Sequence, residues 1–154
     1  MNKTFSYYVE KFIGFIVGVG SAVLVYKSWT VCSFICTSNF FDKIITISTT
    51  LFGFLLTVLT LIVQSSSAVI SNMKKRGSYK RLISFNKNIV LLSAIVCILS
   101  LVLNSTTQKI NTDDVSRTIK ILSLINFSLF LWAVTDTFIF VFIFYKLLIS
   151  ETES

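Results

Sequence analysis

The sequence contains no histidine and no proline, and only 7 of its 154 residues are acidic. Histidine is the commonest general base and metal ligand, so its absence removes the usual basis of hydrolytic and metal-dependent chemistry. A Gly-rich phosphate loop and a nucleophile with a positioned base are also absent. We therefore expect no enzymatic activity, no catalytic residues, no cofactor and no metal. Without proline, nothing predicts a sharply kinked or broken helix.

Cysteine is also scarce, with three residues at positions 32, 36 and 97. Cys32 and Cys36 are four residues apart, a spacing at which two thiols on one helix form only a strained disulfide. They would supply half of a metal site with no nearby partner. We interpret all three as packing residues, because free cysteine behaves as a small hydrophobic side chain.

Long apolar runs take the place of polar surface in this chain. Hydrophobic residues make up 54% of the sequence and charged residues 14%, and the mean hydropathy is +0.81. Charged residues divide it into four runs, each able to cross the hydrocarbon core of a bilayer. The sequence predicts one all-α integral membrane domain over residues 1–154, an up-down bundle of four transmembrane helices. The predicted spans cover about residues 12–33, 44–73, 88–108 and 121–145.

The connection at residues 74–87, KKRGSYKRLISFNK, contains six basic residues and no acidic one. Basic residues gather in loops that stay in the cytoplasm, so we expect this loop and both termini to be cytoplasmic in a multi-pass protein of the cell inner membrane. The loop is too small for a nucleic-acid-binding domain, and we expect no sequence-specific nucleic-acid binding. A lipid headgroup contact or a docking surface for a cytoplasmic protein is favoured. The basic residues are Lys74, Lys75, Arg76, Lys80, Arg81 and Lys87.

Small and polar residues recur in the second predicted span at intervals of four and three. We call this set the threonine seam; its members are Thr46, Thr50, Gly53, Thr57, Thr60, Gln64, Ser67 and Ser71. A 3.5-residue repeat keeps one stripe facing a partner helix. The seam therefore predicts either close helix packing or, in an assembly of several copies, the lining of an aqueous pore.

The first predicted span has a packing face of its own, formed by Gly14, Gly18 and Ala22. Gly14 and Gly18 form a GxxxG motif within an apolar run, a pattern that favours close contact between helices in membranes. The motif leaves open whether the contact lies within one chain or between two.

Asp136 is the one acidic residue well inside a predicted span. Counting ten residues from the nearest cytoplasmic lysine places Ser21, Gln64, Cys97 and Asp136 about 15 Å above the inner boundary. These four residues are predicted to form a polar layer, with Gln64 as hydrogen-bond donor to the carboxyl group. Asp136 is then either a buried carboxyl that fixes helix register or a site that titrates with protons or cations.

A short four-span chain with no soluble domain, a basic loop at residues 74–87 and a Thr/Ser-rich second helix resembles the small membrane components of bacterial anti-phage defence systems, of the Kiwa membrane-subunit type. The likeness covers the whole chain and lies in its architecture. It implies a homo-oligomer in the inner membrane that senses infection and works with a cytoplasmic effector.

We expect a non-enzymatic oligomeric sensor or scaffold that signals to a cytoplasmic partner through the basic loop. The alternative is an ion channel lined by the threonine seam. A third possibility is a proton-coupled small transporter that uses Asp136.

Overall fold

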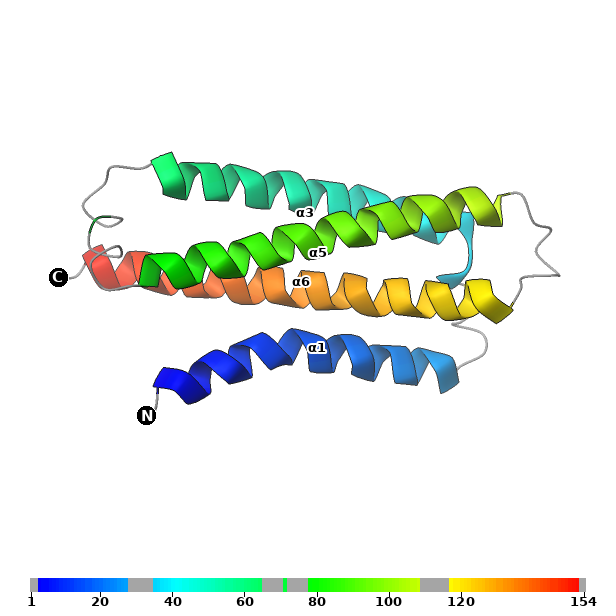
Figure 1. Cartoon of the computed structure of the whole chain (residues 1–154), viewed down its shortest axis with the longest axis horizontal. Coiled ribbons are helices and arrows are strands. Elements are labelled where there is room, and N and C mark those ends of the chain that lie inside the picture. Colours follow the sequence, from blue (N-terminus) through cyan, green and yellow to red (C-terminus); the bar gives the residue numbers. More distant parts are fainter. Residues whose placement is uncertain (1–2, 28–34, 65–70, 72–77, 109–116, 153–154) are drawn as a thin grey trace.

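The computed structural model describes residues 3–27, 35–64, 71, 78–108 and 117–152. Four long helices make up almost all of this part of the chain (Figure 1): α1 (Lys3–Lys27), α3 (Ser38–Gln64), α5 (Ser78–Thr107) and α6 (Arg117–Thr152). Consecutive long helices alternate in direction, so the beginning of α1 and the end of α6 lie at the same end of the molecule (Figure 1).

Three of these helices are long and apolar enough to cross a membrane: α3, α5 from Tyr79 to Thr107, and α6 from Arg117 to Lys146. Only 17%, 33% and 22% of their most apolar stretches, in that order, are buried within the chain. The remaining apolar surface needs a non-aqueous surrounding, which a bilayer supplies. Helix α1 contains a shorter apolar segment, Phe12–Lys27. The chain is therefore an all-helical membrane protein.

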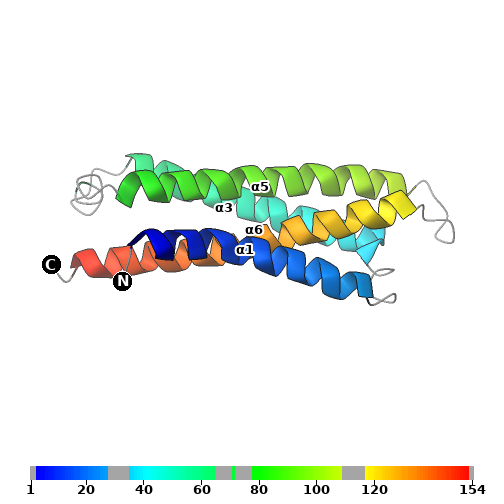
Figure 2. The same ribbon diagram turned by 60° about the horizontal axis from the view of Figure 1, so that its bottom comes forward.

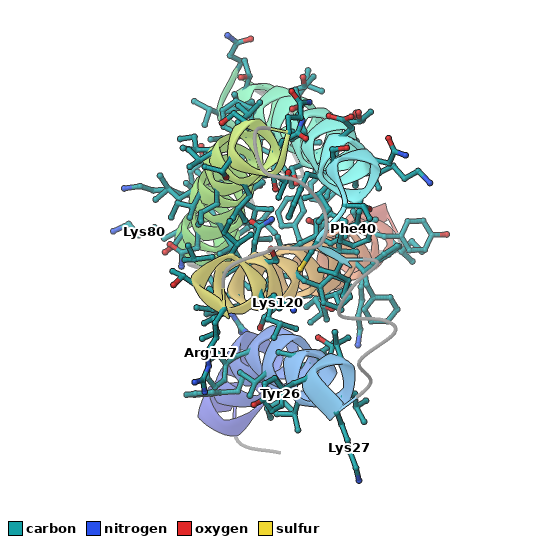
Figure 3. The ribbon with its side chains drawn as sticks, turned by 90° about the vertical axis from the view of Figure 1, so that its right-hand side faces the viewer. Tyr26, Lys27, Phe40, Lys80, Arg117 and Lys120 are labelled. Carbon is teal, nitrogen blue, oxygen red and sulfur yellow. The ribbon has the colours of Figure 1, made fainter. Side chains whose placement is uncertain are left out.

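The helices pack in the spatial order α1, α6, α5, α3. Helix α1 packs on α6, α6 also packs on α5, and α5 packs on α3, whereas α3 and α6 touch only slightly. Phe40 of α3 reaches Phe127 of α6, with ring centroids 5.9 Å apart. Viewed from the end, α1 lies on the side of α6 that faces away from α3 and α5 (Figure 3), and Figure 2 shows α1 running alongside α6. Helix α6 is therefore packed on two sides.

The interior of α3, α5 and α6 is organised by a heptad on α5. Its buried positions alternate in steps of four and three: Leu82, Asn86, Ile89, Ser93, Val96, Ser100 and Leu103. Leu55 and Ile62 of α3 and Phe140 of α6 complete a buried apolar cluster with Leu82 and Ile89. The 3.5-residue repeat keeps this stripe between its two neighbouring helices along the whole of α5.

The helices extend beyond most of the predicted spans. Helix α5 begins at Ser78, so residues 78–87 of the predicted loop are helical, and that part of the prediction is wrong. Charged residues end an apolar run but do not end a helix, because Lys and Arg are good helix formers. Helices α1 and α6 are longer than predicted for the same reason, beginning at Lys3 and ending at Thr152. Residues 28–33, 65–70 and 72–77 lie outside the described part.

Candidate functional site

The structure does not bring the four residues of the predicted polar layer together. Ser21 donates a hydrogen bond to the carbonyl oxygen of Gly18 over 2.7 Å. Cys97 lies 3.5 Å from the Thr49 hydroxyl on α3. Gln64 is exposed at the last residue of α3, and no hydrogen bond joins it to Asp136 among the described residues.

The depth count is wrong for Gln64 because it assumed that every span meets the inner boundary at the nearest lysine. Ile62 belongs to the same buried cluster as Leu82, which lies in the first two turns of α5. Gln64 is therefore level with the beginning of α5, well away from Cys97 in the middle of that helix. The four residues therefore make separate contacts and do not form a common layer.

The GxxxG motif of α1 packs against α6 of the same chain. Gly14 and Gly18 are buried, while Ala22, one turn later, is partly buried. A Cβ added at Gly18 would lie 2.7 Å from the carbonyl oxygen of Ser128 and 3.2 Å from the Cβ of Trp132. Such distances require a residue without a side chain, so the motif sets how closely α1 approaches α6.

Asp136 lies against Gly14 in this contact. A Cβ added at Gly14 would overlap the Asp136 carboxyl and would lie 2.5 Å from Trp132 Cδ1. Trp132, one turn before Asp136, also meets the ring of Phe15 edge-on, with centroids 5.3 Å apart. We call this set of residues the glycine contact: Gly14, Gly18, Ser128, Trp132 and Asp136.

Two polar groups of the glycine contact are buried beside each other. They are the Asp136 carboxyl and the indole N–H of Trp132, which is placed to donate toward it. Asp136 as a whole is only 8% exposed. A charged carboxylate at the centre of a bilayer costs at least about 2.5 kcal/mol, so this residue has to be neutralised or to gain a partner.

The threonine seam lies on the face of α3 that points away from the rest of the chain. Its six members in α3 are all exposed, and so is Ser71, while Ser67 lies outside the described residues. The buried face of α3 is marked by Ile44, Ser48 and Leu55. At 100° per residue, Thr46 and Thr50 lie nearly opposite Ser48. Within the described part of the chain, the seam residues of α3 therefore lie away from the helix face that packs on α5.

The threonine hydroxyls of the seam are satisfied within α3 itself. Thr46, Thr50, Thr57 and Thr60 each donate to the backbone carbonyl four residues earlier, at 2.8–2.9 Å. Gly53, between them, has open space where a Cβ would be. This bonding lets the hydroxyls face an apolar surrounding without an unsatisfied donor.

A second polar set, missing from the sequence-based predictions, lies inside the molecule. Asn86 and Asn126 are 0% exposed and link helices. Asn86 donates to the carbonyl oxygen of Leu55 on α3 over 3.2 Å, and Asn126 of α6 donates to Ser100 of α5 over 2.8 Å. The signal was present in the sequence as the seven-residue spacing of Asn86, Ser93 and Ser100, with the apolar residues Ile89 and Val96 between them.

The basic residues predicted to meet a partner fall partly on α5. Lys80, Arg81 and Lys87 are exposed on this helix, and Lys80 points away from the other helices (Figure 3). Lys74, Lys75 and Arg76 lie outside the described residues. The beginning of α5 lies at the same end of the molecule as the beginning of α1 and the end of α6 (Figure 1).

No protein-family description, curated protein or solved structure matches this chain. Among the described residues, no group of three or more His, Cys, Asp or Glu side chains could hold a metal ion. The sites that remain for consideration are the glycine contact and the exposed threonine seam.

The glycine contact predicts different outcomes for two glycines of the same helix. Gly14→Ala introduces a methyl group into the Asp136 carboxyl, and we expect it to lower the free energy of unfolding by about 1–3 kcal/mol, as overpacking does. Gly20→Ala is the matched control, because nothing lies within 4 Å of a Cβ at that position. The measurement is denaturation in mild detergent. Equal losses in the two variants would contradict a close α1–α6 contact at Gly14.

Proposed function

We propose that this chain is a non-enzymatic, homo-oligomeric sensor or scaffold of the cell inner membrane. In this proposal all four long helices cross the bilayer, and both termini lie on the cytoplasmic side. Copies of the chain associate through the threonine seam, and the basic end of α5 meets a cytoplasmic protein. The exposure of the seam on the outer face of α3 carries the proposal.

The seam is suited to a contact between identical helices. Its small side chains allow two backbones to approach, which is how helices associate where lipid removes the hydrophobic driving force. Its heptad spacing keeps one stripe in contact along a left-handed crossing. Gly53 has open space on this face, so a neighbouring helix would meet no side chain there. The apolar face of α3 is already used against α5, which leaves the seam as the face available to another copy.

The orientation rests on charge. Lys80, Arg81 and Lys87 follow three further basic residues in the sequence, and the segment from 74 to 87 contains no acidic residue. Such a concentration favours the cytoplasmic face. The termini then lie on that face as well, since the ends of α1 and α6 share this end of the molecule (Figure 1). The resemblance to membrane components of anti-phage systems supplies the candidate stimulus, infection, and the candidate partner, a cytoplasmic effector.

Self-association through the seam predicts that Gly53→Leu disrupts the oligomer. Leucine at this position fits the single chain, because nothing lies within 4 Å of a Cβ there, but it would separate two seams in contact. Gly20→Leu is the control, since Gly20 of α1 also has open space. We expect light scattering in detergent to show a smaller assembly for Gly53→Leu alone. An unchanged assembly in both variants would remove the seam from the interface.

An ion channel is the second candidate, and the exposed hydroxyls of the seam favour it. Around the axis of an assembly these side chains would line a polar path, although they form no charged ring. Thr57→Leu should leave the single chain intact, because Thr57 is exposed and its hydroxyl bonds to the carbonyl of Gly53 within its own helix. If the seam lines a pore, this variant should reduce ion flux through reconstituted liposomes several-fold. Liposomes that stay tight with the assembled wild-type protein present would exclude the channel.

The partner surface predicts that removing charge at the basic end abolishes binding of a cytoplasmic protein. The variant changes Lys74, Lys75, Arg76, Lys80 and Arg81 to Gln. The control changes Lys43, Arg117 and Lys120 to Gln at the opposite end of the molecule. We expect affinity purification to recover the partner with the wild type and the control but not with the first variant. The same partner yield from all three proteins would contradict the proposal.

A further inference from the structure

The glycine contact contains a buried carboxyl group that the proposed function does not use. Asp136 is only 8% exposed, and Trp132, one turn earlier on the same face of α6, offers it its indole N–H. A neutral donor does not balance the charge of a carboxylate that is removed from water, whereas a bound proton removes that charge. The close approach of Gly14 leaves little room for a larger ligand.

The position of α1 determines whether water reaches Asp136. The carboxyl group lies directly under Gly14, and Gly18 continues the contact one turn later at Ser128 and Trp132. Helix α1 packs principally on α6 and covers it from the side opposite to α3 and α5 (Figure 3). Separating α1 from α6 would therefore expose the carboxyl group and leave the packing of α3 and α5 in place.

We propose that Asp136 is a proton-binding site whose occupancy holds α1 against α6. With the proton bound, the carboxyl group is neutral and fits beneath Gly14 inside the membrane. When the proton leaves to water, the carboxylate carries a charge that no described cationic side chain balances, and α1 separates from α6 so that water can hydrate it. The ligand is the proton itself, taken from and returned to water.

Among the described side chains of α1 and α6, few charged groups lie near this site. The described side chains of α1 include only two titratable groups, Tyr26 and Lys27, which are twelve and thirteen residues from Gly14, or about 18 Å or more along the helix. On α6, Tyr145 and Lys146 are nine and ten residues from Asp136, or about 14 Å or more.

Other titratable groups lie on α5 and in the turn of α1 before Gly14. On α5, which lies on the side of α6 away from α1 (Figure 3), Lys87 is exposed and Cys97 contacts Thr49 of α3. The turn of α1 that precedes Gly14 carries Glu10 and Lys11. Glu10 is the group whose titration has to be separated from that of Asp136.

Trp132 is a natural probe of this contact, because the chain contains only two tryptophans. In a Trp29→Phe background, or Trp29→Tyr if the first does not fold, all tryptophan emission comes from Trp132. The full chain in detergent micelles is titrated from about pH 4 to about pH 9, the range in which buried carboxyl groups titrate. We expect the emission to move to longer wavelength and acrylamide quenching to rise as the pH increases.

Three further variants in the same background decide what the titration reports. Asp136→Asn should keep the short-wavelength emission at every pH, and Glu10→Gln should titrate like its parent. Gly18→Leu should hold α1 away from α6, because its Cβ would lie 2.7 Å from the Ser128 carbonyl oxygen, and should show long-wavelength emission throughout.

Three results would overturn the proposal. One is Trp132 emission that does not change with pH in the parent, and another is the parent's titration persisting in Asp136→Asn. The third is a full pH-dependent shift that remains in Gly18→Leu, because the emission would then follow the charge without movement of α1. None of these results depends on the oligomeric state or on a cytoplasmic partner.

Discussion

Helix α6 is packed on two sides, with α1 on one and the pair α3 and α5 on the other. The arrangement of the other helices depends on these two contacts. On one side its residues Asn126 and Phe140 meet the interior formed with α3 and α5. On the other side Trp132 and Asp136 receive the glycines of α1. Because α1 packs principally on α6, its place in the molecule depends on how closely two helices can approach at Gly14 and Gly18. A residue with a side chain at either position would remove the principal support of α1.

The polar residues divide according to whether a side chain can satisfy itself within its own helix. Threonine can bond to the carbonyl four residues earlier, and the exposed seam residues Thr46, Thr50, Thr57 and Thr60 do so. The three asparagine amides at 86, 104 and 126 instead donate across to other helices. A side-chain amide has two donors and an acceptor to satisfy, which favours a place between helices. The threonines of the seam therefore lie on an outer face of the molecule, whereas the three asparagines lie where helices meet.

Much of the helical content could be predicted from the sequence, because charge and apolar length are local properties. The GxxxG motif also identified a close contact correctly, but nothing in Gly14 and Gly18 could say that α6 of the same chain was the partner. The two heptads show the limit most clearly. The threonine seam of α3 and the stripe of α5 that contains Asn86, Ser93 and Ser100 have the same spacing, yet one is exposed and the other buried.

The reason is that lipid and protein interior are both apolar, so hydrophobicity does not distinguish an inward from an outward face in a membrane. Depth counting failed at Gln64 for a related reason. A lysine marks where a polar region of the sequence begins. The position of a residue along the bundle is set instead by the residues of the neighbouring helix beside which it packs. The charge of Asp136 singled it out within an apolar span and left open whether it is a buried carboxyl or a titrating site, whereas its neighbours Gly14 and Trp132 could be placed around it only by the packing of α1 on α6.

The length of the helices has a mechanical consequence. At about 1.5 Å per residue, the 30 residues of α5 and the 36 of α6 form rods of about 45 Å and 54 Å, longer than a hydrocarbon core of about 30 Å. Helix α5 carries Lys80 and Arg81 near one end and Asn104, bonded to Asp42, near the other. A stiff rod pushed or tilted at one surface displaces its far tip at the other. The residues at the two ends of α5 therefore cannot move independently of one another.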